Sequence, residues 1–158
     1  MPFEEKLTWV NASVTLMVAA VYAWIVGGRV AGSHIGDVSY QIPLLVAIGA
    51  MIALTIIGTI TVSIATAIGR AVRAEVTGEG TAADAVADLD RKDERDDHIA
   101  RHGDRIGYYV SSGLMLGALA LSMLRSDQFW IANAIFGALV IAGLASSMAK
   151  IAAYHRGF

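Results

Sequence analysis

Long apolar stretches alternate with polar ones along this chain, and four of the apolar stretches contain no Asp, Glu, Lys, Arg or His. A helix rises about 1.5 Å per residue, so about 20 apolar residues cross the hydrocarbon core of a bilayer. The stretches that meet this length cover residues 7–26, 42–68, 106–124 and 129–149. The pattern predicts an all-α membrane protein, in which a bundle of four transmembrane helices forms a single domain over residues 1–158.

Polar segments of different length join the predicted spans. Residues 125–128 form a short turn, which makes spans three and four antiparallel neighbours. The segment between spans two and three, about residues 70–105, holds most of the charge. Thr81 follows a pair of glycines in this segment and is typical of a helix N-cap. We expect a charged helix to begin there and to lead into span three, with Gly103 as its weakest point.

The composition supports a membrane location and predicts an orientation. The chain is 56% hydrophobic and only 16% charged. Of its 12 Lys and Arg residues, all but Arg29 and Arg125 lie on the side that holds both termini and the charged segment. The positive-inside rule then places that side in the cytoplasm of a bacterial inner membrane. The first span follows two acids and is long for a signal peptide, so we expect it to be retained.

Charge and residue content argue against several classes of function. The net charge is −2 and basic residues are interleaved with acidic ones, so we expect no nucleic-acid partner. The absence of cysteine excludes disulfides, thiolate metal sites and a cysteine nucleophile. Spans without an ionisable residue lack the usual working group of a proton relay or an ion-coupled pump. We expect no enzymatic activity.

Small residues recur at helical spacing on the last two predicted spans. Hydrophobic burial drives little helix association in lipid, so close approach of backbones at small residues holds such helices together. We predict helix packing, either within one chain or between two copies, at Gly113, Gly117, Ala134, Ala138, Ala142 and Ser146.

Hydroxyl residues form another helical stripe on span two, at Thr55, Thr59 and Ser63. Such side chains bond to a carbonyl of their own helix or to a neighbouring helix. A polar path for a solute is the alternative interpretation. It makes a small transporter or channel one of the function hypotheses.

The charged segment contains the residues that are best suited to bind a metal ion or another ligand. Four titratable residues stand at intervals of four and share one side of a helix: Asp90, Glu94, His98 and His102. Two imidazoles beside carboxylates can bind a divalent transition metal, so a metal-binding membrane sensor is a second hypothesis. The alternative is a solvated helix with ordinary ion pairs, such as Asp97 with Arg101. Apart from such a metal, we expect no cofactor.

Several short blocks stand in a distinctive order at both ends and in the centre of the chain. They are FEEK and Trp9 at the start, DERD before Ile99 in the centre, and FWIANA, SMAKIAAY and RGF at the end. Together they resemble a family of small, uncharacterised bacterial membrane proteins with four spans. The resemblance carries no established biochemical activity. Members often occur beside small helix-turn-helix regulators, which implies a regulatory or accessory component of the membrane.

The resemblance also points to a set of candidate contact residues. The charged positions that match the family are Asp93, Arg95 and Asp96 in the centre and Lys150 and Arg156 in the tail, and the central three are the candidates. We predict that they contact a partner, which is either a second copy in a homodimer or another membrane or cytoplasmic regulatory protein. The lipid bilayer is the other expected partner.

Overall fold

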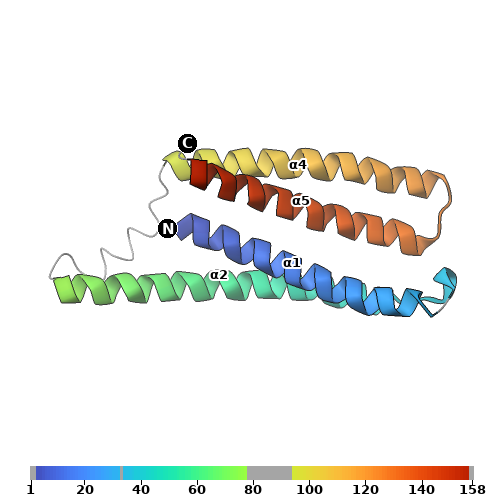
Figure 1. Cartoon of the computed structure of the whole chain (residues 1–158), viewed down its shortest axis with the longest axis horizontal. Coiled ribbons are helices and arrows are strands. Elements are labelled where there is room, and N and C mark those ends of the chain that lie inside the picture. Colours follow the sequence, from blue (N-terminus) through green and yellow to red (C-terminus); the bar gives the residue numbers. More distant parts are fainter. Residues whose placement is uncertain (1–2, 33, 78–93, 157–158) are drawn as a thin grey trace.

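The computed structural model describes residues 3–32, 34–77 and 94–156, and this part of the chain is all helical. In chain order the elements are α1 (Phe3–Val30), a 3-10 turn η1 (Ile35–Asp37), α2 (Gln41–Thr77), α4 (Glu94–Met123) and α5 (Gln128–Arg156) (Figure 1). All four α-helices are long and apolar enough to cross a membrane. The prediction of an all-α chain with four helices of spanning length is confirmed.

The four helices form an open bundle, because each one packs mainly on its neighbour in a row. Helix α4 packs along α5, α5 packs on α1, and α1 packs on α2 (Figure 1). Among the described residues, the two outer helices α2 and α4 share no extensive contact. Helix α1 begins and α5 ends at the same end of the bundle, so the two chain termini lie close to each other there (Figure 1).

Helix α4 includes both the charged residues 94–105 and the apolar span that follows. It is continuous from Glu94 to Met123 and passes through Gly103 without a break. The start that we predicted for this charged helix, at Thr81, lies outside the described residues. Gly103 is buried against α5, so it is a packing position rather than the weak point that we expected.

A tight turn reverses the chain between α4 and α5. The Ser126 N–H donates to the Leu121 carbonyl at 3.1 Å, and the Arg125 N–H donates to the Ser122 carbonyl at 3.1 Å. Arg125 has a φ of 54°, the left-handed conformation that completes a Schellman ending of a helix. This ending satisfies the last carbonyls of α4 and directs the chain straight back into α5.

The apolar core lies between α1, α5 and the start of α2. Tyr22 of α1 meets Phe136 of α5 edge to face, with ring centroids 4.9 Å apart. Tyr40, just before α2, meets Phe129 of α5 in the same way at 5.2 Å. The Tyr22 hydroxyl donates to the Asn133 carboxamide at 2.7 Å, so this polar group is satisfied where α1 crosses α5. These aromatic pairs join the α1–α2 hairpin to the α4–α5 hairpin.

Candidate functional site

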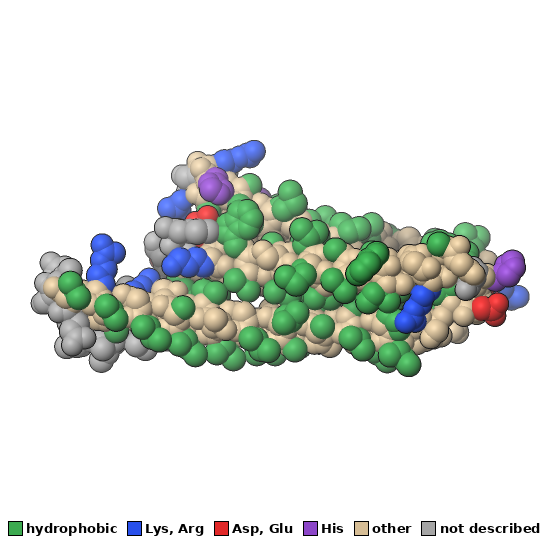
Figure 2. Space-filling model, turned by 60° about the horizontal axis from the view of Figure 1, so that its bottom comes forward, with side chains coloured by type: hydrophobic (Ala, Val, Ile, Leu, Met, Phe, Trp, Pro, Cys, Tyr) green, Lys and Arg blue, Asp and Glu red, His purple; other side chains and the backbone are tan. Residues whose placement is uncertain are grey.

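Charged side chains gather at the end of the molecule that holds the two chain termini. Figure 2 shows most of the Lys and Arg side chains at this end, while apolar side chains cover the length of the helices. The first part of α4, residues 94–105, packs here on the last part of α5. We call this end of the molecule the polar end.

Two glycines hold the charged part of α4 against α5. A Cβ atom at Gly103 would lie 2.4 Å from Lys150 Cγ and 2.9 Å from the Ser146 carbonyl oxygen. A Cβ atom at Gly107 would lie 3.0 Å from Ser146 Cβ and 3.2 Å from the Ala142 carbonyl oxygen. At Gly103 the backbones are too close for any side chain, and at Gly107 a side chain would need the neighbouring atoms to shift. Gly103 and Gly107 have the same i, i+4 spacing as Gly113 and Gly117. The sequence analysis nevertheless missed them as a packing pair.

The predicted packing residues fall into two groups. On α5, Ala138 and Ala142 are buried, and Ala134 and Ser146 are partly buried. On α4, Gly113 and Gly117 are exposed, and a Cβ added at either would meet nothing within 4 Å. Packing of α4 within the chain therefore uses the glycines nearer the polar end. A contact of Gly113 and Gly117 with a second copy stays a prediction.

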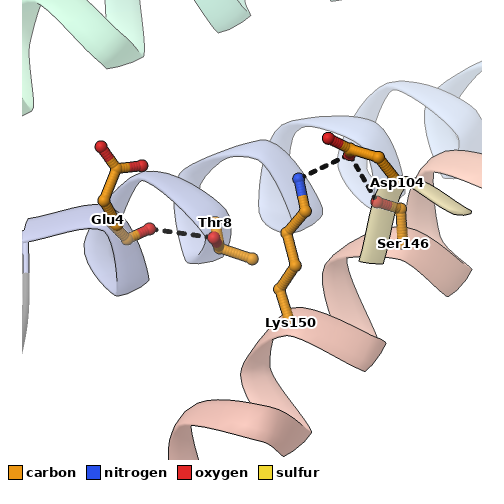
Figure 3. A network of polar contacts seen from close by, with 5 residues as sticks. All are labelled: Glu4, Thr8, Asp104, Ser146 and Lys150. Atoms are coloured by element: carbon orange, nitrogen blue, oxygen red, sulfur yellow. Dashed lines mark hydrogen bonds and ion pairs between the residues drawn. The ribbon is translucent and has the colours of Figure 1, made fainter. Parts of the chain in front are cut away.

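An ion pair joins α4 and α5 beside the buried glycines. Lys150 Nζ lies 2.7 Å from Asp104 Oδ1, and the Ser146 hydroxyl donates to the same oxygen at 3.3 Å (Figure 3). The Lys150 side chain is 23% exposed and that of Asp104 is 67% exposed. The pair is thus partly screened by solvent and contributes little to stability. Figure 3 also shows the Thr8 hydroxyl of α1, which donates to the Glu4 carbonyl at 2.9 Å.

Two further polar contacts join the helices at the polar end. The Tyr154 hydroxyl of α5, beyond the apolar stretch 129–149, donates to Asp96 Oδ1 of α4 at 3.1 Å. Burial raises the pKa of Tyr154, and the hydrogen bond to Asp96 raises it further, so this hydroxyl stays a donor at neutral pH. Glu5 of α1 is buried, and its Oε1 atom lies 3.8 Å from His155 Nε2. The sequence analysis did not single out Glu5 or Tyr154.

Of the three predicted partner residues, the structure describes two, and these two have different surroundings. Asp96 is partly buried and accepts the Tyr154 hydroxyl, so it serves the contact between α4 and α5. Arg95 is exposed on the outer side of α4. Asp93 lies outside the described residues.

The exposed face of the charged part of α4 carries both signs of charge. Its described residues are Glu94, Arg95, Asp97, His98, Arg101, His102, Asp104 and Arg105, of which Asp97 is half-buried. The Arg101 guanidinium lies 3.8 Å from the Asp97 carboxylate, an exposed pair that contributes little to stability. Three guanidinium groups and two imidazoles thus stand among three carboxylates, of which Asp97 pairs with Arg101 and Asp104 pairs with Lys150 of α5. We call this surface the α4 face.

The predicted metal ligands do not converge with a third ligand in the described structure. His98 and His102 lie on α4 and line one side of a groove of about 390 Å³. Arg156 of α5 lines the same groove, and its positive charge opposes a cation. Among the described residues, no group of three or more His, Cys, Asp or Glu could hold a metal ion, and Glu94 joins no such group. Asp90 lies outside the described part, so the metal hypothesis stays a prediction.

The hydroxyl stripe of α2 uses its hydrogen bonds locally. The Ser63 hydroxyl donates to the Thr59 carbonyl at 2.8 Å, four residues back on the same helix. The nearby Thr61 hydroxyl does the same to the Ile57 carbonyl at 2.7 Å. Thr59 is exposed and Thr55 partly buried. This back-bonding is the ordinary behaviour of hydroxyl residues in apolar helices, and the transporter hypothesis gains no support from it.

Comparison with protein-family models, with curated proteins and with solved structures gave no match. The resemblance to small bacterial membrane proteins therefore stays a prediction that depends on the sequence blocks alone.

Proposed function

We propose that this chain is a multi-pass membrane protein of the bacterial inner membrane, without catalytic activity, which acts as a regulatory or accessory component. Its polar end lies in the cytoplasm. The α4 face binds an acidic surface, either on a second copy of the chain or on another regulatory protein.

One observation carries this proposal: the α4 face is rich in charge, exposed and held on a rigid support. Gly103 and Gly107 bring α4 into backbone contact with α5, and Lys150 and Tyr154 of α5 reach across to α4. A surface mounted in this way loses little conformational entropy when it binds, which favours recognition of a partner. Its three guanidinium groups favour carboxylates, which they can bind with two parallel hydrogen bonds.

The test compares two sets of charge-neutralising variants. Two copies with different tags are expressed together, and the amount of one copy that purifies with the other is measured in mild detergent. Arg95→Gln with Arg101→Gln and Arg105→Gln is expected to reduce this capture by up to about 100-fold, because rim charges of this kind each contribute up to about 1 kcal/mol. If the partner is a different protein, a cross-linker attached to the Arg95→Cys variant in cells should join it to that protein. The segment of the partner next to the cross-link should then contain acidic residues.

The matched control neutralises arginines at the other end of the molecule. Arg29→Gln with Arg125→Gln removes charge far from the polar end and should leave capture unchanged. Equal capture by the wild type and by the α4 variant, together with no cross-linked product, would reject the α4 face as a binding surface.

A further inference from the structure

A second cavity at the polar end lies between α1 and α2, at the other edge of the row from α4. It has a volume of about 470 Å³ and is lined by the first turns of α1 and by the later part of α2. Its lining includes three cationic side chains, a hydroxyl and apolar groups: Lys6, Arg70, Arg73, Thr66, Phe3 and Val62. We call it the basic pocket.

The charges of the basic pocket favour an anion. No Asp or Glu is among the described residues that line it. The carboxylate of Glu5, in the same turn of α1 as Lys6, lies instead beside His155 of α5. Arg70 and Arg73 each have another partner, and a guanidinium has five N–H donors, so it can keep that partner and still donate to an oxyanion. Clusters of ammonium and guanidinium groups are the protein groups that bind phosphate best.

The position of the pocket along the helices identifies the source of the phosphate. The apolar stretch of α1 begins directly after Lys6, and that of α2 ends two positions before Arg70. The three cations therefore lie where an apolar surface meets a polar one, at the level of lipid headgroups. Ile64 and Ile68, just before Arg70, are 54% and 59% exposed and offer a surface to acyl chains.

We propose that the basic pocket binds the phosphate of an anionic phospholipid headgroup, with the acyl chains lying along α2. The cations of zwitterionic headgroups are disfavoured, because the lining offers positive charge and no described carboxylate. This inference rests on the membrane insertion in the proposed function but is independent of the α4 face.

The test measures which lipids stay bound after purification. The protein is reconstituted in nanodiscs of phosphatidylcholine mixed with phosphatidylglycerol, and native mass spectrometry then counts the lipids retained. The wild type should retain phosphatidylglycerol preferentially. Lys6→Gln with Arg70→Gln and Arg73→Gln should lower that preference about 10- to 100-fold, since each cation near an anionic surface contributes about fivefold.

Three control variants separate a built pocket from general attraction to an anionic surface. The charge-conserving set Lys6→Arg, Arg70→Lys and Arg73→Lys should keep the preference, as should Arg29→Gln with Arg125→Gln. Gly69→Phe keeps every charge but fills the pocket, and its new side chain starts in open space, so the helix should accept it. This variant should lose the preference. If circular dichroism shows that the triple Gln variant does not fold, the Gly69→Phe variant still tests the proposal.

Three results would overturn the proposal. Equal retention of the two lipids by the wild type, or an unchanged preference in Gly69→Phe, would show that the pocket selects no headgroup. Displacement of bound lipid by millimolar inorganic phosphate would assign the pocket to a soluble anion instead. Capture through the α4 face should be the same in all these variants, so failure of one proposal is distinct from failure of the other.

Discussion

The two helix hairpins have the same topology and similar length, yet they pack very differently. The α4–α5 hairpin is in close contact at Gly103 and Gly107, and the ion pair of Asp104 with Lys150 lies alongside. In the α1–α2 hairpin the tightest glycine contact is with a side chain instead of a backbone: a Cβ atom added at Gly58 would lie 2.6 Å from Val10 Cγ1. Helix α2 is the most apolar of the four helices and also the least buried.

This difference shows that apolar character alone does not make these helices pack on one another. Large β-branched side chains such as Ile52, Ile56 and Ile60 cover α2 and are more than half exposed. In the bilayer that we propose, lipid tails would solvate these side chains as well as another helix would, so nothing would favour their burial against a helix. Close packing occurs instead where small side chains let two backbones meet, as on α4 and α5.

The largest effect is expected at the closest contact of the α4–α5 hairpin. Gly103→Ala places a methyl group against the Ser146 carbonyl, which belongs to the backbone and cannot move aside. We expect the free energy of unfolding to fall by about 1–3 kcal/mol, measured by titration with a denaturing detergent. The control is Gly113→Ala on the same helix, where the methyl group meets nothing. Equal stability of the two variants would contradict the packing described for α4.

A smaller effect is expected in the α1–α2 hairpin. Gly58→Ala meets only the Val10 side chain, which can shift, so we expect a loss of about 1 kcal/mol in the free energy of unfolding. Hydrogen exchange should increase in α1 and α2 but not in α4. Gly49→Ala, an open position on the same helix, should not have this effect. If Gly58→Ala destabilised the protein more than Gly103→Ala, the two hairpins would not differ as we describe.

The smallest effect is expected from the ion pair. A double-mutant cycle with Asp104→Asn and Lys150→Met should give a coupling free energy of about 0.5 kcal/mol, because Asp104 is mostly exposed. A cycle on the longer pair of Asp97 with Arg101 should give less, because both partners there are exposed. Equal coupling free energies in the two cycles would show that the pair of Asp104 with Lys150 is no stronger than an exposed ion pair within one helix.

The existence and length of the four helices could be predicted from the sequence because the bilayer thickness sets a length that apolar runs must meet. The contacts between the helices could not. Gly103 and Gly113 stand on the same helix at similar spacing from another glycine, but only the first faces α5. Periodicity shows that residues share a face, but it does not show which face meets a neighbour.

The polar contacts at the polar end could be predicted in part. Asp104 and Lys150 stand about equally far from the turn between α4 and α5, so an antiparallel hairpin brings them level. The contacts of Tyr154 with Asp96 and of Glu5 with His155 depend on how the helices are rotated. The basic pocket also joins residues from helices whose rotation the sequence does not specify.

The open order of the helices has a consequence for permeation. In a closed bundle, all helices can line a shared central lumen, whereas the order α4–α5–α1–α2 keeps the outer helices apart in the described structure. This order gives a single copy no central lumen that all four helices line, whereas a ring of several copies could enclose one. Counting subunits by single-molecule photobleaching would show whether such a ring forms.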